Sequence, residues 1–281
     1  MTAATEFLQH VSAIGFALVG LVAVVQWYRQ RDRQGAYLAF ALGLFGLASL
    51  TGEIERDVGL TRPDGTSSAP PIIAAILGLV GLGLFMGCAY ALLLFRHQLL
   101  PVRRQTLRAV AVVMVVTGLP LVPLTFYPAF AKQNPGLVLA LIIPLFVVWC
   151  LAIGEPVYRM WRVSGTRPAV QRGRLRALAA GYGLIIVVLV LAIGVASVSP
   201  GQRLEPASPV ALAEQLVILL AVPILYVSFA PPRWLRRSWR AAEEEAFNEA
   251  LHDLLLGSPN TSALAERGLS WATRPVGAEG G

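Results

Sequence analysis

A few ionisable residues set among long apolar stretches are the groups in this sequence that could do chemistry. Glu6 and His10 are four residues apart, so they share one face of a helix. Glu53 and Glu55 end a second apolar stretch. Carboxylates and an imidazole at one membrane surface could bind a cation or a cationic ligand. The competing interpretation, which we favour for the acids, is that they are simply hydrated at the interface.

The pair Glu214–Gln215 differs from these, because apolar residues flank it on both sides. Ionisable residues inside membrane spans are energetically costly and often mark functional sites. Glu214 is therefore the stronger candidate for a ligand or signal site. Glu155, near the end of another apolar stretch, has an ordinary explanation in an ion pair with Arg159 one turn later.

Other kinds of active site find no support in the sequence. The three histidines, His10, His97 and His252, are far apart in the expected topology, and no metal-ligand spacing occurs. Cys88 and Cys150 both fall within apolar stretches and are interpreted as buried apolar residues. No nucleotide-binding glycine motif is present. We therefore predict no catalytic residue, no metal and no cofactor in these residues.

Composition indicates which elements must position the candidate residues. Hydrophobic residues make up 56% of the chain and charged residues only 14%, with a mean hydropathy of +0.65. Soluble domains carry roughly 25% charged residues. The sequence therefore predicts an all-α integral membrane protein with a bundle of spanning helices.

Seven stretches approach the roughly 20 apolar residues that a spanning helix needs. They are Phe7–Trp27, Ala36–Ile54, Pro71–Phe95, Leu107–Tyr127, Gly136–Tyr158, Ala177–Val198 and Pro209–Phe229. Prolines 120, 123, 144 and 223 fall inside these stretches and predict bends. Gly83 and Gly87 have the GxxxG spacing that lets helices approach closely.

The basic residues predict how the seven helices are oriented. Alternate connections and the C-terminal tail contain 19 of the 23 Arg and Lys residues, and the other side contains 4. Cytoplasmic segments collect Arg and Lys, so the N-terminus is expected outside and the C-terminus in the cytoplasm. Residues 1–230 are then the membrane domain, in the plasma membrane.

A charged helix is predicted to follow the seventh span. Pro231-Pro232 should end that span, and residues 231–257 begin basic and become acidic. Phe247, Leu251 and Leu254 form one apolar stripe at helical spacing. Such a helix could relay motion from the bundle, ideally paired in a homodimer. His252, although followed by Asp253, is interpreted as part of a solvated face.

The last residues, 258–281, resemble the start of a GAF domain. The residues that carry the resemblance are Leu264, Leu269, Ala272, Val276, Gly277 and Ala278. The strand that should follow is missing, so we expect that the chain is cut at a domain boundary.

Together, the seven spans, the charged helix and this GAF-like start resemble the N-terminal seven-transmembrane sensory region of histidine kinases. The resemblance implies a missing cytoplasmic output, which would be a histidine kinase or else a diguanylate cyclase or phosphatase. Its implied partners are the lipid bilayer, a second copy of the chain, and a small-molecule or membrane-derived stimulus, with no nucleic acid.

Two other classes of membrane protein compete with this interpretation. A retinal-binding protein needs a lysine in the seventh span, and the only lysine, Lys132, lies in a predicted loop. A small transporter or a membrane accessory subunit stays open as the alternative, although the two halves show no internal repeat.

Overall fold

The computed structural model describes residues 2–31, 33–57, 71–127, 130, 133–198 and 209–257, and every element in this part is helical. The long helices are α1 (Thr2–Gln30), α2 (Arg33–Asp57), α3 (Pro71–Leu99), α4 (Arg104–Gly118), α7 (Pro135–Ser164), α8 (Ala169–Val198), α9 (Pro209–Phe229) and α10 (Arg233–Gly257). A 3-10 turn, η1 (Leu119–Leu121), and the short α5 (Val122–Phe126) extend α4.

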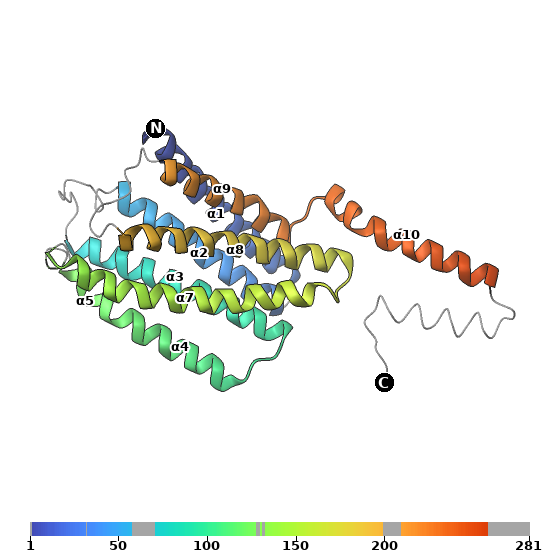
Figure 1. The fold of residues 1–281 in the computed structure, drawn as a ribbon, viewed down its shortest axis with the longest axis horizontal. Helices are drawn as coiled ribbons and strands as arrows, with labels where there is room; N and C mark the ends of the chain where they lie inside the picture. Colours follow the sequence, from blue (N-terminus) through green and yellow to red (C-terminus); the bar gives the residue numbers. More distant parts are fainter. Residues whose placement is uncertain are drawn as a thin grey trace.

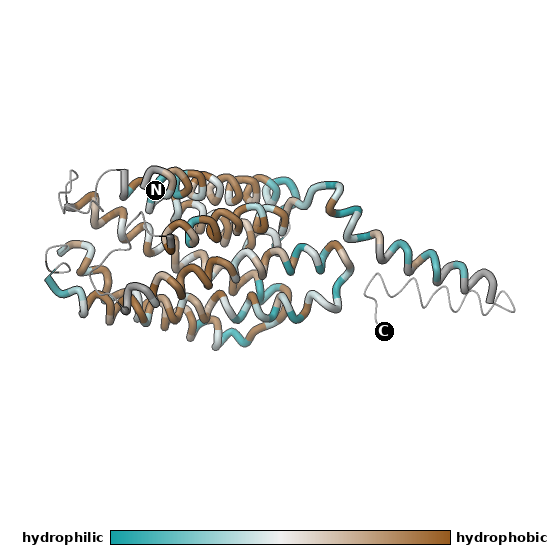
Figure 2. Tube along the Cα trace, turned by 45° about the horizontal axis from the view of Figure 1, so that its top comes forward, coloured by the Kyte–Doolittle hydropathy of each residue, from teal (hydrophilic) through white to brown (hydrophobic). Residues whose placement is uncertain are grey.

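Among the described residues, seven helices are long and apolar enough to cross a membrane, as the sequence predicts. Helices α1, α2, α3, α7, α8 and α9 each supply one such segment, and α4, η1 and α5 together supply Arg104–Phe126. Figure 2 shows the apolar residues concentrated along the bundle and the hydrophilic ones along α10. This is the arrangement of a multi-pass membrane protein.

The seven segments lie side by side in one bundle (Figure 1). Consecutive helices pack together, as α1 with α2, α2 with α3, α7 with α8 and α8 with α9. Helix α9 also packs on α1, whereas α4 lies at the periphery against α3 and α7. Helix α10 leaves the bundle and contacts α8.

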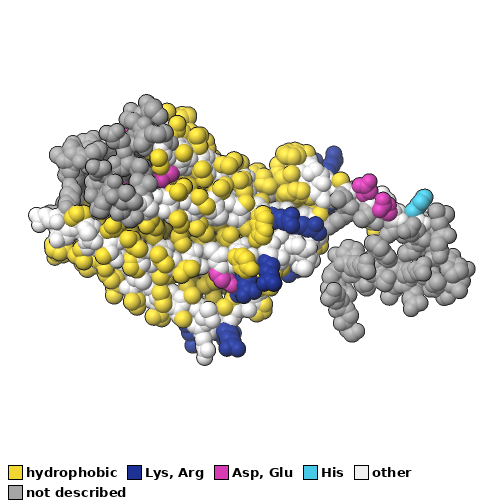
Figure 3. Space-filling view, in the orientation of Figure 1, with side chains coloured by type: hydrophobic (Ala, Val, Ile, Leu, Met, Phe, Trp, Pro, Cys, Tyr) yellow, Lys and Arg dark blue, Asp and Glu magenta, His cyan; other side chains and the backbone are white. Residues whose placement is uncertain are grey.

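The two ends of the bundle differ in charge. We call the end that α10 leaves the arginine end, defined by Arg29, Arg96, Arg159 and Arg174. Figure 3 shows the basic side chains gathered in that half of the molecule. We call the opposite end, which holds Glu6, His10, Glu53, Glu55 and Glu214, the acidic end.

Several arginines that the sequence analysis assigns to loops lie within helices. Arg96 belongs to α3, Arg159 to α7, and Arg174 to α8, which begins at Ala169 rather than near Ala177. The long aliphatic part of an arginine side chain lets a helix continue beyond the apolar layer while the guanidinium reaches polar groups. The predicted spans were therefore too short at this end.

The outer surface of the bundle is apolar. On α1, Ile14, Leu18 and Leu21 are exposed at helical spacing, and on α4 so are Val112 and Val115. In water such a surface would aggregate, but lipid chains cover it without a free-energy cost. The bundle therefore needs only a small buried core to hold its helices together, because its outer surface is covered by lipid.

Glycines set the crossing of α1 and α2. A Cβ on Gly20 would lie 2.8 Å from the Leu42 carbonyl oxygen, and one on Gly46 would lie 2.7 Å from that of Phe16. The two backbones touch, so only glycine fits at these positions. The predicted GxxxG pair on α3 is half right: a Cβ on Gly87 would meet Leu44 at 3.2 Å, but one on Gly83 would meet nothing within 4 Å.

Two of the prolines interrupt the regular α-helix of one span. Pro120 lies in η1 and Pro123 at the start of α5, and the span tightens there from α-helix to a 3-10 turn. Since proline lacks the backbone N–H, the regular hydrogen-bond ladder is interrupted. Pro144 and Pro156, in contrast, lie inside the continuous helix α7.

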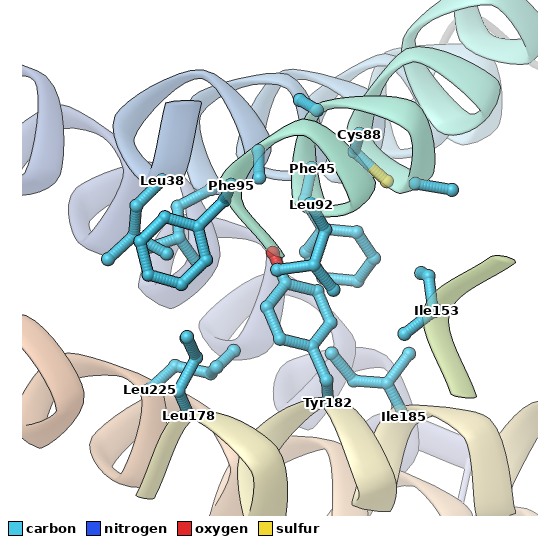
Figure 4. Close-up of a cluster of buried hydrophobic side chains, with 14 of the residues drawn as sticks. Leu38, Phe45, Cys88, Leu92, Phe95, Ile153, Leu178, Tyr182, Ile185 and Leu225 are labelled. Carbon is cyan, nitrogen blue, oxygen red and sulfur yellow. The ribbon is translucent and has the colours of Figure 1, made fainter. Parts of the chain in front are cut away.

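The core lies where α1, α2, α3, α7, α8 and α9 meet, and Figure 4 shows part of it. Tyr182 is fully buried and points from α8 toward Phe45 and Leu92. Trp149 is also fully buried, stacks on Phe85 with ring centroids 4.4 Å apart, and donates its indole N–H to the Phe85 carbonyl oxygen at 2.8 Å. This core holds the helices of the bundle together.

Candidate functional site

A contact between His10 and Glu53 at the acidic end joins α1 to α2. The His10 Nε2 atom lies 3.2 Å from a carboxylate oxygen of Glu53, whose side chain is 10% exposed. The other ring nitrogen, Nδ1, donates to the backbone carbonyl oxygen of Glu6 at 2.8 Å, because a carbonyl can only accept. A hydrogen bond from His10 to Glu53 then needs a second proton, on the ring or on the carboxyl group.

The spacing of Glu6 and His10 places them on one face of α1, and the structure gives this contact a different form. Glu6 contributes its backbone and its side chain is exposed, whereas the acidic side chain that meets His10 comes from α2. Glu53, interpreted from the sequence as hydrated, is instead buried. The antiparallel packing of α1 on α2 is what brings the two side chains together.

Glu55 faces a different environment from Glu53. Two residues further along a helix is a rotation of roughly 200°, so the two carboxylates leave α2 in different directions. Glu55 lines a cavity of about 710 Å³ inside the acidic half of the bundle. The wall of this cavity comes from α1, α2, α3, η1, α7, α8 and α9.

This cavity is the feature that sequence reasoning missed. Its lining is dominated by apolar residues such as Phe85, Leu145 and Val188, which look locally like any other core residues. Only the packing of helices distant in sequence creates the space between them. The one available signal was Glu55 itself, an acid at the end of an apolar stretch.

Glu214 and Gln215 lie in the first half of α9 and are partly buried. One carboxylate oxygen of Glu214 is buried and has no hydrogen-bond partner among the described residues. Glu214 is not part of the cavity lining, although Ile218 one turn later is. Of the candidate acids, Glu55 lines the cavity and Glu214 does not.

The predicted ion pair of Glu155 with Arg159 is confirmed, with 3.3 Å between the Arg159 Nε atom and a carboxylate oxygen. Arg96 of α3 makes a shorter contact to the same oxygen, at 2.8 Å, and its side chain is only 9% exposed. This cluster ties α3 to α7 at the arginine end. Both arginines bind the same carboxylate oxygen of Glu155, which favours a structural role.

Arg174 connects the start of α8 to the end of α9. Its Nε atom donates to the Ser228 carbonyl oxygen at 2.8 Å, and its terminal nitrogen donates to that of Phe229 at 3.3 Å. The last carbonyl groups of a helix lack partners within the helix and carry partial negative charge. Arg174 therefore fixes the point from which α10 leaves the bundle.

Helix α10 rests on α8 through Trp239. A Cβ placed on Gly173 would lie 2.5 Å from the Trp239 ring, so the indole packs directly on the glycine. The predicted relay residue Phe247, further along α10, is 50% exposed. The side chains of Leu251 and Leu254 lie outside the described residues, as does the whole GAF-like segment 258–281.

Within the described part of the chain, no three His, Cys, Asp or Glu side chains come together as a metal site requires. His97, at the end of α3, accepts a hydrogen bond from the backbone N–H of Val102 at 2.8 Å, which is a local turn contact. His10 lies at the other end of the bundle. No family model, no curated protein and no solved structure matches this chain.

Proposed function

We propose that the chain is the membrane-embedded input module of a bacterial signal-transduction protein, most simply a sensor histidine kinase. In this proposal the acidic end faces outward and receives a stimulus. The arginine end faces the cytoplasm, where α10 leads to an output domain. A diguanylate cyclase or phosphatase output would use the same input.

The observation that carries the proposal is that the cavity and the contact with α10 lie at opposite ends of the bundle. The cavity and Glu55 lie in the acidic half, and the contact between Trp239 and Gly173 lies at the arginine end. Helix α8 runs between the two, with Ile185 and Val188 lining the cavity and Gly173 under Trp239. A ligand that moves α8 at the cavity would therefore also change the contact between Gly173 and Trp239 on α10.

The character of α10 supports a relay. It follows a spanning helix directly after Pro231-Pro232, begins with Arg233, Arg236 and Arg237, and extends away from the bundle. Its basic start suits an anionic cytoplasmic membrane surface. The exposed Phe247 would pack against the same helix of a second copy, so the proposed active form is a homodimer.

The mechanism is a shift between two arrangements of the bundle. A stimulus changes their populations only if it binds one of them more tightly than the other. In one arrangement Trp239 sits on Gly173, and in the other it is released. The fixed end of α9, held by Arg174, acts as the pivot.

Gly173→Ala tests the relay in the full-length protein. A methyl group here must displace the indole, so we expect output activity in membranes, measured for a kinase as autophosphorylation with labelled ATP, to change several-fold and to lose its dependence on stimulus. Gly183→Ala is the matched control on the same helix, because a Cβ there meets nothing within 4 Å. Equal activity in the wild type and both variants would contradict the relay.

A further inference from the structure

The cavity in the acidic half points to a ligand class. We propose that it binds a lipophilic organic cation, such as a protonated or quaternary amine with an apolar body, and that this ligand is the stimulus. The second part rests on the proposed function, whereas the binding itself does not.

The size of the cavity suits a small molecule. Ligand pockets typically measure roughly 300–1,000 Å³ and combine apolar walls with a few polar groups. This one, at about 710 Å³, is far larger than a packing defect in a helical core. It begins where the buried core ends, since Phe45 and Ile185 belong to both (Figure 4).

The walls favour an apolar ligand with a positive charge. Four of the lining residues are phenylalanines, Phe16, Phe45, Phe85 and Phe146. Phe16 packs edge-to-face on Phe45 at 4.9 Å between ring centroids, and Phe85 packs likewise on Phe146 at 5.6 Å. Aromatic faces attract cations, and such walls recognise quaternary ammonium groups.

The carboxylate of Glu55 determines that the ligand is positively charged. It is the acidic residue of the lining, and the described lining contains no arginine, lysine or histidine. The hydroxyl of Ser49, another lining residue, already donates to the Phe45 carbonyl oxygen at 3.0 Å. An anionic ligand would meet the Glu55 carboxylate without a partner, whereas a cation would pair with it.

The position of Glu55 fits a ligand that enters from the acidic end. It lies in the last turn of α2, which ends at Asp57, while Phe85 and Leu145 lie deeper along their helices. A cation would keep its charge on the side of the cavity that holds Glu55 and place its apolar body among the phenylalanines, whose ring faces also attract the charge. Burial of the apolar part provides most of the affinity.

A matched pair of ions tests the proposal directly. Tetraphenylphosphonium and tetraphenylborate have the same shape and opposite charge. Their binding to the purified chain in nanodiscs is measured by equilibrium dialysis, with empty nanodiscs of the same lipids subtracted. We expect saturable binding of the cation and none of the anion. Glu55→Gln should weaken cation binding about tenfold, whereas Glu6→Gln, an exposed acid at the same end, should not.

A second pair of variants tests the location. A Cβ on Gly52, which lines the cavity, or on Gly83, which does not, would meet no atom within 4 Å. Gly52→Leu should therefore place a bulky side chain in the cavity and weaken binding, whereas Gly83→Leu should bind as the wild type does. Circular dichroism and size-exclusion elution confirm that each variant is folded.

Three outcomes would overturn the inference: no saturable binding of the cation, equal binding of both ions, or unchanged binding in Gly52→Leu. Equal binding would identify the cavity as a site for uncharged apolar molecules or lipid chains. None of these outcomes affects the relay, which Gly173→Ala tests through α10 alone. Conversely, a wild-type response in Gly173→Ala would remove the relay and leave the binding site intact.

Discussion

At the scale of single residues, the described structure contains polar groups whose burial has a cost. The Tyr182 hydroxyl lies in the apolar core and has no hydrogen-bond partner among the described residues. The Glu53 carboxylate is also buried, but it contacts His10. Sequence reasoning identified the acids, because charges stand out in apolar spans. It passed over Tyr182, because a tyrosine in a span is unremarkable until its neighbours are known.

Tyr182→Phe is therefore expected to preserve or raise stability. An unsatisfied buried hydroxyl costs about 1–3 kcal/mol, and removing it recovers part of that cost. The measurement is the thermal unfolding midpoint in one detergent, with Tyr158→Phe as the control because Tyr158 is 60% exposed. A clear fall in the midpoint for Tyr182→Phe alone would mean that the hydroxyl has a partner and a role in the fold.

At the scale of the elements, apolar composition and length predicted each spanning helix but not how the helices meet. The α1–α2 crossing depends on Gly20 and Gly46, and the sequence gives no way to choose them over Gly83. The extension of α8 back to Ala169 was also missed, because arginines are normally typical of loops between spanning helices. Its arginines were counted as loop residues, although Arg174 caps α9 from within the helix.

The proposed pairing of α10 with the same helix of a second copy can be tested by cross-linking. With Cys88 and Cys150 replaced by alanine, Phe247→Cys should form a disulfide-linked dimer in oxidised membranes, because paired helices bring this face together. Glu245→Cys is the control, since Glu245 is also exposed but lies about 200° around the helix. The two are compared on non-reducing gels. Equal cross-linking at both positions, or none at either, would contradict a paired α10.

At the scale of the whole molecule, the sequence predicted the class correctly because membrane insertion depends on composition and length. The charge difference between the two ends could also be predicted from the sequence, because it depends only on the positions of the arginines. The cavity was not predictable, because it is the space left between seven elements and no short stretch encodes it. The proposed stimulus site is thus a property of the assembled bundle, and the proposed relay a property of its junction with α10.

The central claim is that this bundle serves as the input to an output domain, and the most direct test is to read the coding sequence past the codon for Gly281. We expect the frame to continue through a strand-rich GAF domain into a histidine kinase, cyclase or phosphatase. A stop codon immediately after Gly281 would contradict it. A small transporter or accessory subunit that binds its ligand in the cavity would then be the better explanation.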